Sequence, residues 1–240
     1  MYRIGTGTVF VLAMLLAISS TGLAQTENDN REFADRFSKT AVTALAPVYG
    51  PLADYLVDKY ALGSRVGVGI DIGGGPGSLS VELAGRTNGM SWINSDINPS
   101  FFPHTAEKAK IAGVEGRVSF IAADVHCLPF RDNFADIIVS RGSFQFWEDI
   151  DKAFAEIYRV LKPGCPAFIG RGFTENLPVG VARDIRKRHG SGPAYDKHET
   201  AAMLEEIARA RGFRDYRIIL PEPSGAEGVN YGVWIEFFKE

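Results

Sequence analysis

The sequence predicts an α/β protein built around a mostly parallel sheet, and two observations lead to this prediction. Residues 66–72 alternate β-branched side chains with glycine and aspartate, which is typical of a buried central strand. A glycine-rich turn over residues 73–77 follows directly, and residues 79–84 then carry apolar side chains at helical spacing. A strand, a glycine turn and a helix in this order form half of a Rossmann-type nucleotide site, where a ligand lies directly on the backbone.

Composition and charge indicate an ordinary globular protein. The chain has 240 residues, of which 45% are hydrophobic and 23% are charged, enough for a full-sized core. The formal net charge of −3 gives no general attraction for nucleic acid or an anionic membrane. No internal repeat or low-complexity linker divides the chain. We therefore expect a helical segment over residues 25–62 and one α/β domain over residues 63–240.

The first 24 residues have the pattern of a secretory signal peptide. Arg3 precedes an apolar run over residues 9–18, and small residues follow, with Gly22 and Ala24 at positions −3 and −1 of a cleavage site. The run is short for a transmembrane helix, which needs about 20 apolar residues. The sequence therefore predicts an exported or periplasmic protein. An uncleaved anchor that contacts the membrane is the alternative, and the protein is cytoplasmic if the leader is not functional.

The remaining elements alternate in the way that a parallel sheet requires. Two amphipathic helices are expected between Glu32 and Leu62, after a frayed lead-in over residues 26–31 and with Pro47 and Pro51 between the helices. Strands are expected at residues 90–95, 118–122, a stretch that ends at Ser140, 166–170, 213–220 and 231–238. Helices are expected at residues 99–112, 150–161, 179–189 and 198–211.

An acid stands at the tip of the second expected strand. Asp96 lies about 20 residues past the glycines, where a carboxylate can accept hydrogen bonds from ribose hydroxyls. A second acid, Asp124, directly follows the third strand. Either acid could instead be a surface carboxylate that binds no ligand.

The glycine turn resembles the first motif of class I S-adenosylmethionine (SAM)-dependent methyltransferases, in the form Asp71-x-Gly73-x-Gly75-x-Gly77. Residues 128–130, 133–140 and 162–164 resemble the "LPF", "FDxIxS" and "KPG" segments of the ubiquinone/menaquinone-biosynthesis-like enzymes, the methyltransferase type 11 family. This resemblance covers roughly residues 67–172. It implies a seven-stranded, mostly parallel sheet of order 3-2-1-4-5-7-6 with helices on both faces, and SAM as cofactor with S-adenosylhomocysteine (SAH) as product.

The resemblance also implies roles for individual residues. Asp71 orients the glycine loop or the methionine amino group through water, or it only braces the loop. Asp124 accepts the adenine amino group, and the amide of Val125 meets a ring nitrogen. Helices that precede the first strand often cap the cofactor pocket in such enzymes, although here they could simply cover a sheet edge. The expected cofactor-binding residues are Asp71, Gly73, Gly74, Gly75, Gly77, Asp96, Ile97, Asp124, Val125 and Ser140.

Weaker candidates for chemistry lie at the carboxyl ends of the strands, where reacting groups gather in such sheets. Arg141 and Arg171 follow neighbouring strands and could clamp an anionic group of the substrate, or they could pair with local acids. Relatives carry an apolar or histidine-containing sequence at the position of Arg141. His126 is the one candidate for a general base near the cofactor, and an exposed loop histidine is its alternative.

Other chemistry-bearing residues give weaker indications. Phe144, Phe146 and Trp147 could form an aromatic wall for a hydrophobic acceptor, and we expect at least one of them to be core. The four histidines lack a metal-ligand spacing, so no metal site is expected. Cys127 and Cys165 are predicted at opposite ends of strands and hence as free thiols. A basic cluster over residues 183–189 could bind a phosphate, but a solvated helix face accounts for it as well.

The function predicted from the sequence is methyl transfer from SAM to a small or lipophilic acceptor, which could be anionic, at oxygen, nitrogen or carbon. An exported protein that binds SAM, SAH or a nucleoside without catalysis is one alternative, because SAM is made in the cytosol. A nicotinamide-dependent oxidoreductase is another, which the glycine pattern disfavours. Nothing in the sequence indicates a nucleic-acid partner, and the sequence leaves the oligomeric state open.

Overall fold

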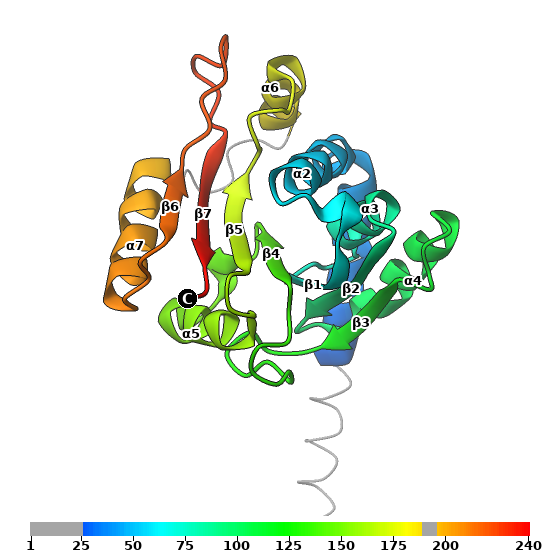
Figure 1. Cartoon of the computed structure of the whole chain (residues 1–240). Helices are drawn as coiled ribbons and strands as arrows, with labels where there is room; N and C mark the ends of the chain where they lie inside the picture. The colour runs from blue at the N-terminus through cyan, green and yellow to red at the C-terminus, as the bar shows by residue number, and fades with distance from the viewer. Residues whose placement is uncertain (1–25, 189–195) are drawn as a thin grey trace, which may run out of the picture.

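The computed structural model describes residues 26–188 and 196–240, so the predicted signal peptide over residues 1–24 lies outside the described residues, as does His189. Seven strands form one sheet of order β3-β2-β1-β4-β5-β7-β6. All pairings are parallel except those of β7, which runs antiparallel to both β5 and β6. The strand order and the mostly parallel sheet confirm the predicted fold (Figure 1).

The elements follow the predicted alternation closely. The strands are β1 (Val66–Ile72), β2 (Gly89–Asp96), β3 (Val118–Ala122), β4 (Ile137–Arg141), β5 (Pro166–Gly172), β6 (Tyr216–Ile219) and β7 (Gly232–Phe238). The helices are residues 26–43, α2 (Ala46–Lys59), α3 (Ser78–Arg86), α4 (Phe102–Ile111), α5 (Ile150–Val160), α6 (Val179–Arg188) and α7 (Lys197–Ala210). Short 3-10 helices are η1 (Leu62–Ser64), η2 (Pro99–Phe101) and η3 (Phe144–Phe146).

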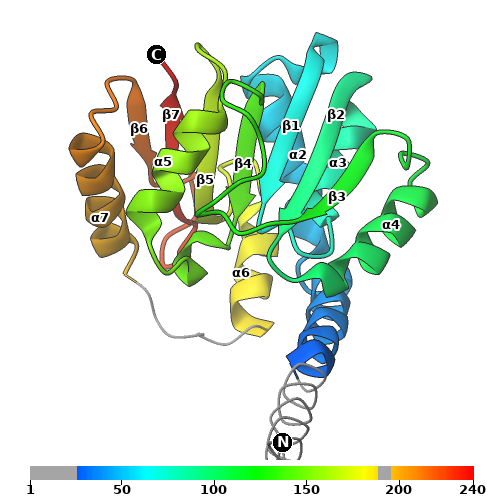
Figure 2. The same cartoon turned by 90° about the horizontal axis from the view of Figure 1, so that it is seen from below.

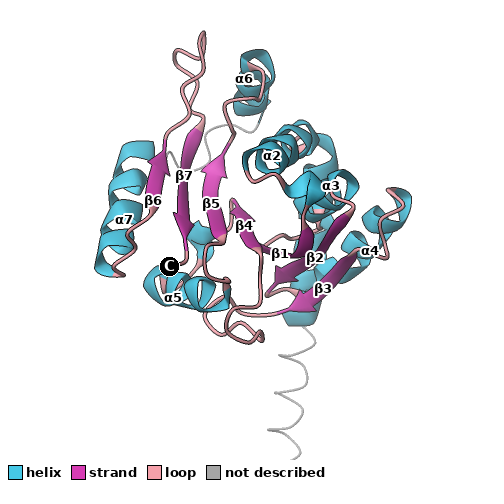
Figure 3. Cartoon of the chain, viewed as in Figure 1, coloured by secondary structure: helices cyan, strands magenta, loops and turns pink. Residues whose placement is uncertain are grey.

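Helices cover both faces of the sheet, with α5 and α7 on one side and α2, α3 and α4 on the other (Figures 1 and 3). Successive side chains of a strand point to opposite faces of the sheet, so each strand packs against both helical layers. On β4, Ile138 packs in the cluster that contains Phe154 of α5, whereas Ile137 and Val139 pack in the cluster that contains Leu52 of α2. Burial on both faces explains why the central strands are almost entirely apolar.

Two tryptophans fill the layer under α2 and α3 because glycines stand opposite them in the sheet. Gly69 on β1 is the register partner of Trp92, and Gly170 on β5 is the partner of Trp234. A Cβ atom at either glycine would lie closer than 3.0 Å to an indole ring. These glycines therefore mark close packing inside strands rather than turns.

The N-terminal helices differ from the prediction in two details. Residues 26–31 are helical and not a frayed lead-in. The side-chain amide of Asn28 donates to the carboxylate of Glu32, one turn later. Pro47 and Pro51 were expected between the helices, but Pro47 lies in the first turn of α2 and Pro51 lies inside it. A proline there removes one backbone hydrogen bond. Burial of Leu52, Ala53 and Leu56 on the same helix offsets that loss.

Residues 26–188 and 196–240 contain neither a membrane-spanning helix nor a metal-binding cluster. None of the helices in this part combines the length and the apolar character that crossing a membrane requires. The same residues contain no group of three or more His, Cys, Asp or Glu side chains that could hold a metal ion. Both cysteines are free thiols, with Cys127 exposed and Cys165 buried.

Candidate functional site

A cavity of about 580 Å³ lies at the carboxyl ends of the central strands, where a doubly wound sheet binds its ligands. Its walls come from the glycine loop after β1, the tips of β2 and β3, the loop after β4 and the helix over residues 26–43. Six of the predicted cofactor-binding residues line it, namely Gly73, Gly75, Asp96, Ile97, Asp124 and Val125.

The glycine loop needs its glycines for two different reasons. Gly73, Gly75 and Gly77 have φ values of 62°, 52° and 72°, a backbone region that other residues rarely adopt. Gly74 has ordinary φ, but a Cβ atom there would collide with the side chains of Asn94 and Asp71. The loop thus lies tightly on the polar side chains beneath it and presents bare backbone to the cavity.

Asp71 lies under the loop and not in the cavity wall. It is 1% exposed, its Oδ2 accepts the hydroxyl of Ser80 at 2.8 Å, and its register partner on β2 is Asn94. Burial, reinforced by the nearby charge of Asp96, raises its pKa to about 7 despite the bond from Ser80. This placement favours the loop-bracing role over contact with a ligand.

Asp96 connects the glycine loop to the tip of β2. Its Oδ2 accepts the amide of Gly75 at 2.9 Å and its Oδ1 accepts the amide of Asn98 at 2.9 Å. Burial raises its pKa, and these backbone bonds oppose the rise. Each carboxylate oxygen can accept more than one hydrogen bond, so both oxygens keep capacity toward the cavity.

Asp124 is anchored by the residue two positions later. Its Oδ1 accepts both the backbone amide of His126, at 2.9 Å, and the imidazole Nδ1, at 2.6 Å. These bonds, foremost the backbone one, hold the pKa of Asp124 below its usual range. The Nε2 of His126 in turn accepts the amide of Asp149 at 3.1 Å. Both ring nitrogens are therefore engaged, which disfavours the general-base role considered for His126.

Three predicted cofactor-binding residues differ in how they meet the cavity. Ile97 is 72% exposed at the rim, whereas Val125 is buried in the wall. Ser140 lies outside the cavity lining, and its buried hydroxyl has no hydrogen-bond partner among the described residues. Ile97 and Val125 are therefore placed to contact a ligand in the cavity, whereas Ser140 is not.

Arg141 and Arg171 do not form the clamp that the sequence left open as one of two alternatives. Arg141 pairs in register with Gly170, so the next residue, Arg171, points to the opposite face of the sheet by strand alternation. The guanidinium of Arg141 stacks 5.4 Å over the ring of Tyr49 and donates to the carbonyl of Gly172 at 3.3 Å. Arg141 takes part in no salt bridge within residues 26–188 and 196–240, so the alternative pairing with a local acid is not formed for this residue either.

Asn94 and Thr105 belong to the site, although the sequence did not single them out. The Asn94 amide donates to the carbonyl of Gly75 and to the hydroxyl of Thr105, both at 2.8 Å. Thr105 also occupies the space that a Cβ atom of Gly77 would need. Asn94 lies two positions before Asp96, so strand alternation was the signal that could have found it.

The helix over residues 26–43 caps the cavity. The rings of Phe33 and Phe37 each meet Phe101 edge-on with centroids 6.1 Å apart, and all three rings line the cavity. Asn98 donates to the carbonyl of Asn30 at 2.9 Å. Figure 2 shows this helix, in dark blue, beside the start of α4. Of the two roles expected for the N-terminal helices, the first helix takes that of a cap.

The aromatic residues after β4 divide between core and cavity. Phe144 is buried in the core, as expected for at least one of them. Phe146 is 79% exposed at the cavity rim. Trp147 lines the cavity as well, and its indole N–H donates to Ser143 at 2.9 Å. This loop therefore supplies an apolar wall opposite the N-terminal helix.

Comparisons with known proteins point to one family. The family profile described as Methyltransferase domain matches residues 70–169. The ubiquinone/menaquinone biosynthesis C-methyltransferase UbiE of Escherichia coli K12 is 38% identical over 172 residues, which cover 68% of this chain and 67% of that protein. A solved structure from Methanococcus maripaludis, provisionally assigned as a SAM-dependent methyltransferase, is 30% identical with a TM-score of 0.73 and covers 87% of this chain and 93% of its own.

A more distant structure shares the fold. The phosphoethanolamine N-methyltransferase 2 of Haemonchus contortus, solved with phosphomonomethylethanolamine and SAH, is 20% identical with a TM-score of 0.57. It covers 88% of this chain and 60% of its own.

Proposed function

Because this chain belongs to the class I SAM-dependent methyltransferases, we propose that it transfers the methyl group of SAM to a small, lipophilic acceptor. The observation that carries this choice of acceptor is the apolar rim of the cavity. Phe33, Ile97 and Phe146 are 49%, 72% and 79% exposed there, whereas large apolar side chains are normally buried. Exposed apolar groups gathered around one opening are typical of a surface that binds an apolar partner.

The residues of the cavity fit SAM. Asp96 accepts the ribose hydroxyls with the lone pairs that Gly75 and Asn98 leave free, and charge-assisted bonds of this kind are strong. Asp124 would accept the adenine amino group, the backbone amide of Val125 would meet a ring nitrogen, and Ile97 lines the same cavity. The absence of side chains at Gly73 and Gly75 lets the cofactor approach the loop backbone.

The transfer itself relies on positioning. SAM supplies an activated methyl group on a sulfonium, so the protein has to align donor and acceptor and exclude water. The helix over residues 26–43 covers the cavity and its phenyl rings keep the opening apolar. His126 has no free ring nitrogen, and we assign it no proton transfer. We propose no catalytic acid or base for this chain.

The relatives narrow the acceptor further. Two relatives, 31% and 38% identical, are named for C-methylation in ubiquinone and menaquinone biosynthesis, so carbon is the acceptor atom to test first. An anionic acceptor has less support, because Arg141 and Arg171 point to opposite faces of the sheet. We therefore favour an apolar aromatic acceptor over a charged one.

The test begins with cofactor binding. Calorimetric titration of the full chain with SAM, SAH and NADH is expected to show micromolar binding of the first two only. Gly75→Arg fills the cavity beside Phe37 and Phe101 and abolishes that binding. Gly85→Arg is the matched control, because a Cβ atom at this position of α3 would meet nothing within 4 Å. A folded protein that binds neither SAM nor SAH would overturn the proposal.

The acceptor is tested with SAM labelled in its methyl group. The full chain is incubated with apolar phenols and quinols of increasing alkyl length, and with polar phenols of similar ring size. Label is expected on a ring carbon of the apolar compounds, with efficiency that rises with alkyl length. Transfer confined to the polar series would refute the lipophilic acceptor while leaving SAM-dependent methyl transfer intact.

A further inference from the structure

His126 joins two walls of the cavity that lie far apart in the sequence. Its Nδ1 bonds to Asp124 at the tip of β3, and its Nε2 accepts the amide of Asp149, which is the N-cap of α5. Asp149 directly follows the loop that carries Phe146 and Trp147 into the cavity. The imidazole side chain is 16% exposed, although its partners Asp124 and Asp149 lie at the surface.

The two bonds fix the tautomer of the imidazole. A backbone amide can only donate, so the Nε2 that faces Asp149 carries no proton. The ring proton is therefore on Nδ1, from which it is donated to Asp124. A histidine held in this way has no nitrogen left for a substrate. Its effect on the reaction must pass through the groups that it touches.

Those bonds leave one oxygen of Asp124 unoccupied. Both the amide and the imidazole of His126 reach Oδ1, and no hydrogen bond within the described part of the chain reaches Oδ2. The carboxylate side chain is 49% exposed, so without the imidazole it would be held by the backbone amide of residue 126 alone. With the imidazole in place, Oδ2 is held at a fixed orientation in the cavity wall.

We infer that His126 is a positioning residue that aims the free oxygen of Asp124 at the exocyclic amino group of adenine. This inference rests on the proposed function, since it assumes that SAM or SAH occupies the cavity. It assigns selectivity for adenine over other purines to a residue that does not touch the base. Through its Nε2, the same imidazole also holds the backbone amide of Asp149 and thereby fixes the loop that carries Phe146 and Trp147.

The experiment compares two ligands that differ only at that amino group. SAH carries it, whereas S-inosylhomocysteine has a ring carbonyl in its place. Calorimetry on the full-length wild-type protein is expected to show about ten-fold or greater preference for SAH, since a charge-assisted bond is lost and two acceptors face each other. His126→Ala is expected to lower the affinity for SAH by about ten-fold and to change the affinity for S-inosylhomocysteine by no more than about two-fold. The preference for SAH then disappears.

Two further variants separate positioning from folding. In His126→Asn the side-chain amide donates from near the place of Nδ1, so it is expected to restore most of the preference. The matched control is His198→Ala, at an exposed position of α7, which is expected to change neither affinity. Equal losses of both ligands in His126→Ala, or an unchanged preference, would overturn the inference. A wild-type protein that does not bind SAH would instead refute the proposed function, and the inference with it.

A measurement on the free protein tests the tautomer without any ligand. Spectra of protein labelled with ¹⁵N at its histidines are expected to show His126 neutral and protonated at Nδ1 near neutral pH. A ring protonated at Nε2 would contradict the bond to Asp149 and overturn the inference, even if the cofactor binds as proposed.

Discussion

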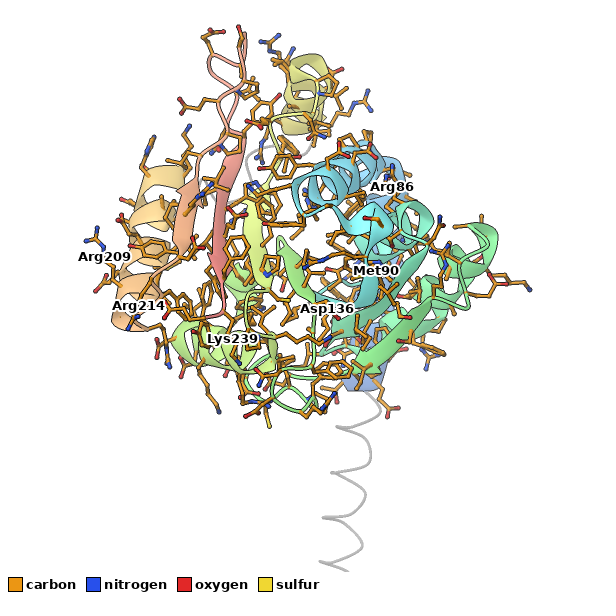
Figure 4. All side chains as sticks on the ribbon, viewed as in Figure 1. Arg86, Met90, Asp136, Arg209, Arg214 and Lys239 are labelled. Atoms are coloured by element: carbon orange, nitrogen blue, oxygen red, sulfur yellow. The ribbon has the colours of Figure 1, made fainter. Side chains whose placement is uncertain are left out.

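Lys162 and Asp136 form an ion pair with Nζ and Oδ2 at 2.7 Å, and the same carboxylate oxygen accepts the amide of Val68 at 2.9 Å. Asp136 directly precedes β4, Lys162 lies in the turn before β5 and Val68 is on β1, so these contacts tie the amino ends of the three strands together. Asp136 is labelled in Figure 4. It belongs to the "FDxIxS" segment and Lys162 to the "KPG" segment. These parts of the family pattern therefore serve the fold, at the end of the sheet away from the cavity.

Asp136→Ala is expected to destabilise the protein without affecting the cofactor. The change leaves the partly buried Lys162 and the amide of Val68 without their acceptor, which should lower the free energy of unfolding by about 1–3 kcal/mol. Urea denaturation measures the loss, and calorimetry with SAH should give the wild-type affinity. Asp136→Asn keeps an acceptor for Val68, so a smaller loss is expected. A large drop in SAH affinity for a folded variant would contradict the structural role.

Removal of the Asp96 carboxylate is expected to weaken the binding of the cofactor. Asp96→Ala takes away the acceptor of the Gly75 and Asn98 amides and, in our proposal, that of the ribose. Two charge-assisted bonds to a ligand correspond to about a 100-fold or larger rise in the Kd of SAH. Asp215→Ala, an exposed acid between α7 and β6, is the control and should bind normally. Wild-type affinity in Asp96→Ala would remove this residue from the site.

The buried Asp71 is expected to make stability depend on pH. Its pKa is raised to about 7 from 3.8, so between these values the folded state holds a proton that the unfolded state has released. Its contribution to stability is present at low pH and is lost as pH rises from about 4 to 7. At 1.36 kcal/mol per pKa unit, the loss is on the order of 4 kcal/mol.

Asp71→Asn isolates this contribution, because the amide has a similar shape and does not ionise. The stability of the variant relative to wild type should increase from pH 4.5 to pH 7 and level off above that, as measured by urea denaturation at each pH. A difference that stays constant across this range would show that Asp71 is not responsible.

The glycine loop and the acids at the strand tips could be predicted because local rules determine them. Gly73 and Gly75 have positive φ, and Asp96 and Asp124 follow strands whose apolar patterns are clear. The roles of Arg141 and Arg171 could not be predicted in the same way. Whether two residues at neighbouring strand tips converge depends on the register between β4 and β5, and a shift of one residue reverses the face.

The part played by His126 depends on contacts that no local pattern reveals. Its partner Asp149 lies 23 positions later, across β4 and η3. The cap helix poses a similar difficulty, because Phe33 and Phe37 have the spacing of any amphipathic helix until Phe101 is brought against them. Sequence patterns thus predicted the glycine loop that lines the cavity, whereas the side chains that close the cavity could be found only from the tertiary structure.

The N-terminal sequence predicts that the protein is exported. If residues 1–24 are a signal peptide, N-terminal sequencing of the protein purified from its native cells should begin at Gln25, in the exported or membrane fraction. Ala24→Arg should block cleavage, since a large charged side chain does not suit position −1. Recovery of the wild-type chain from the cytosol with Met1 intact would contradict export and would place the enzyme where SAM is made.

The apolar rim should govern the acceptor and not the cofactor. Phe146 is 79% exposed, so Phe146→Asp removes a rim contact and adds a charge at little cost to stability. We expect the KM for a lipophilic acceptor to rise by about ten-fold, because loss of an aromatic contact is worth about 1–2 kcal/mol, while the KM for SAM changes little. Ile111→Asp is the matched control, because Ile111 is equally exposed on α4 but lies outside the cavity lining. If both variants raise the acceptor KM alike, the effect comes from surface charge and the rim does not bind the acceptor.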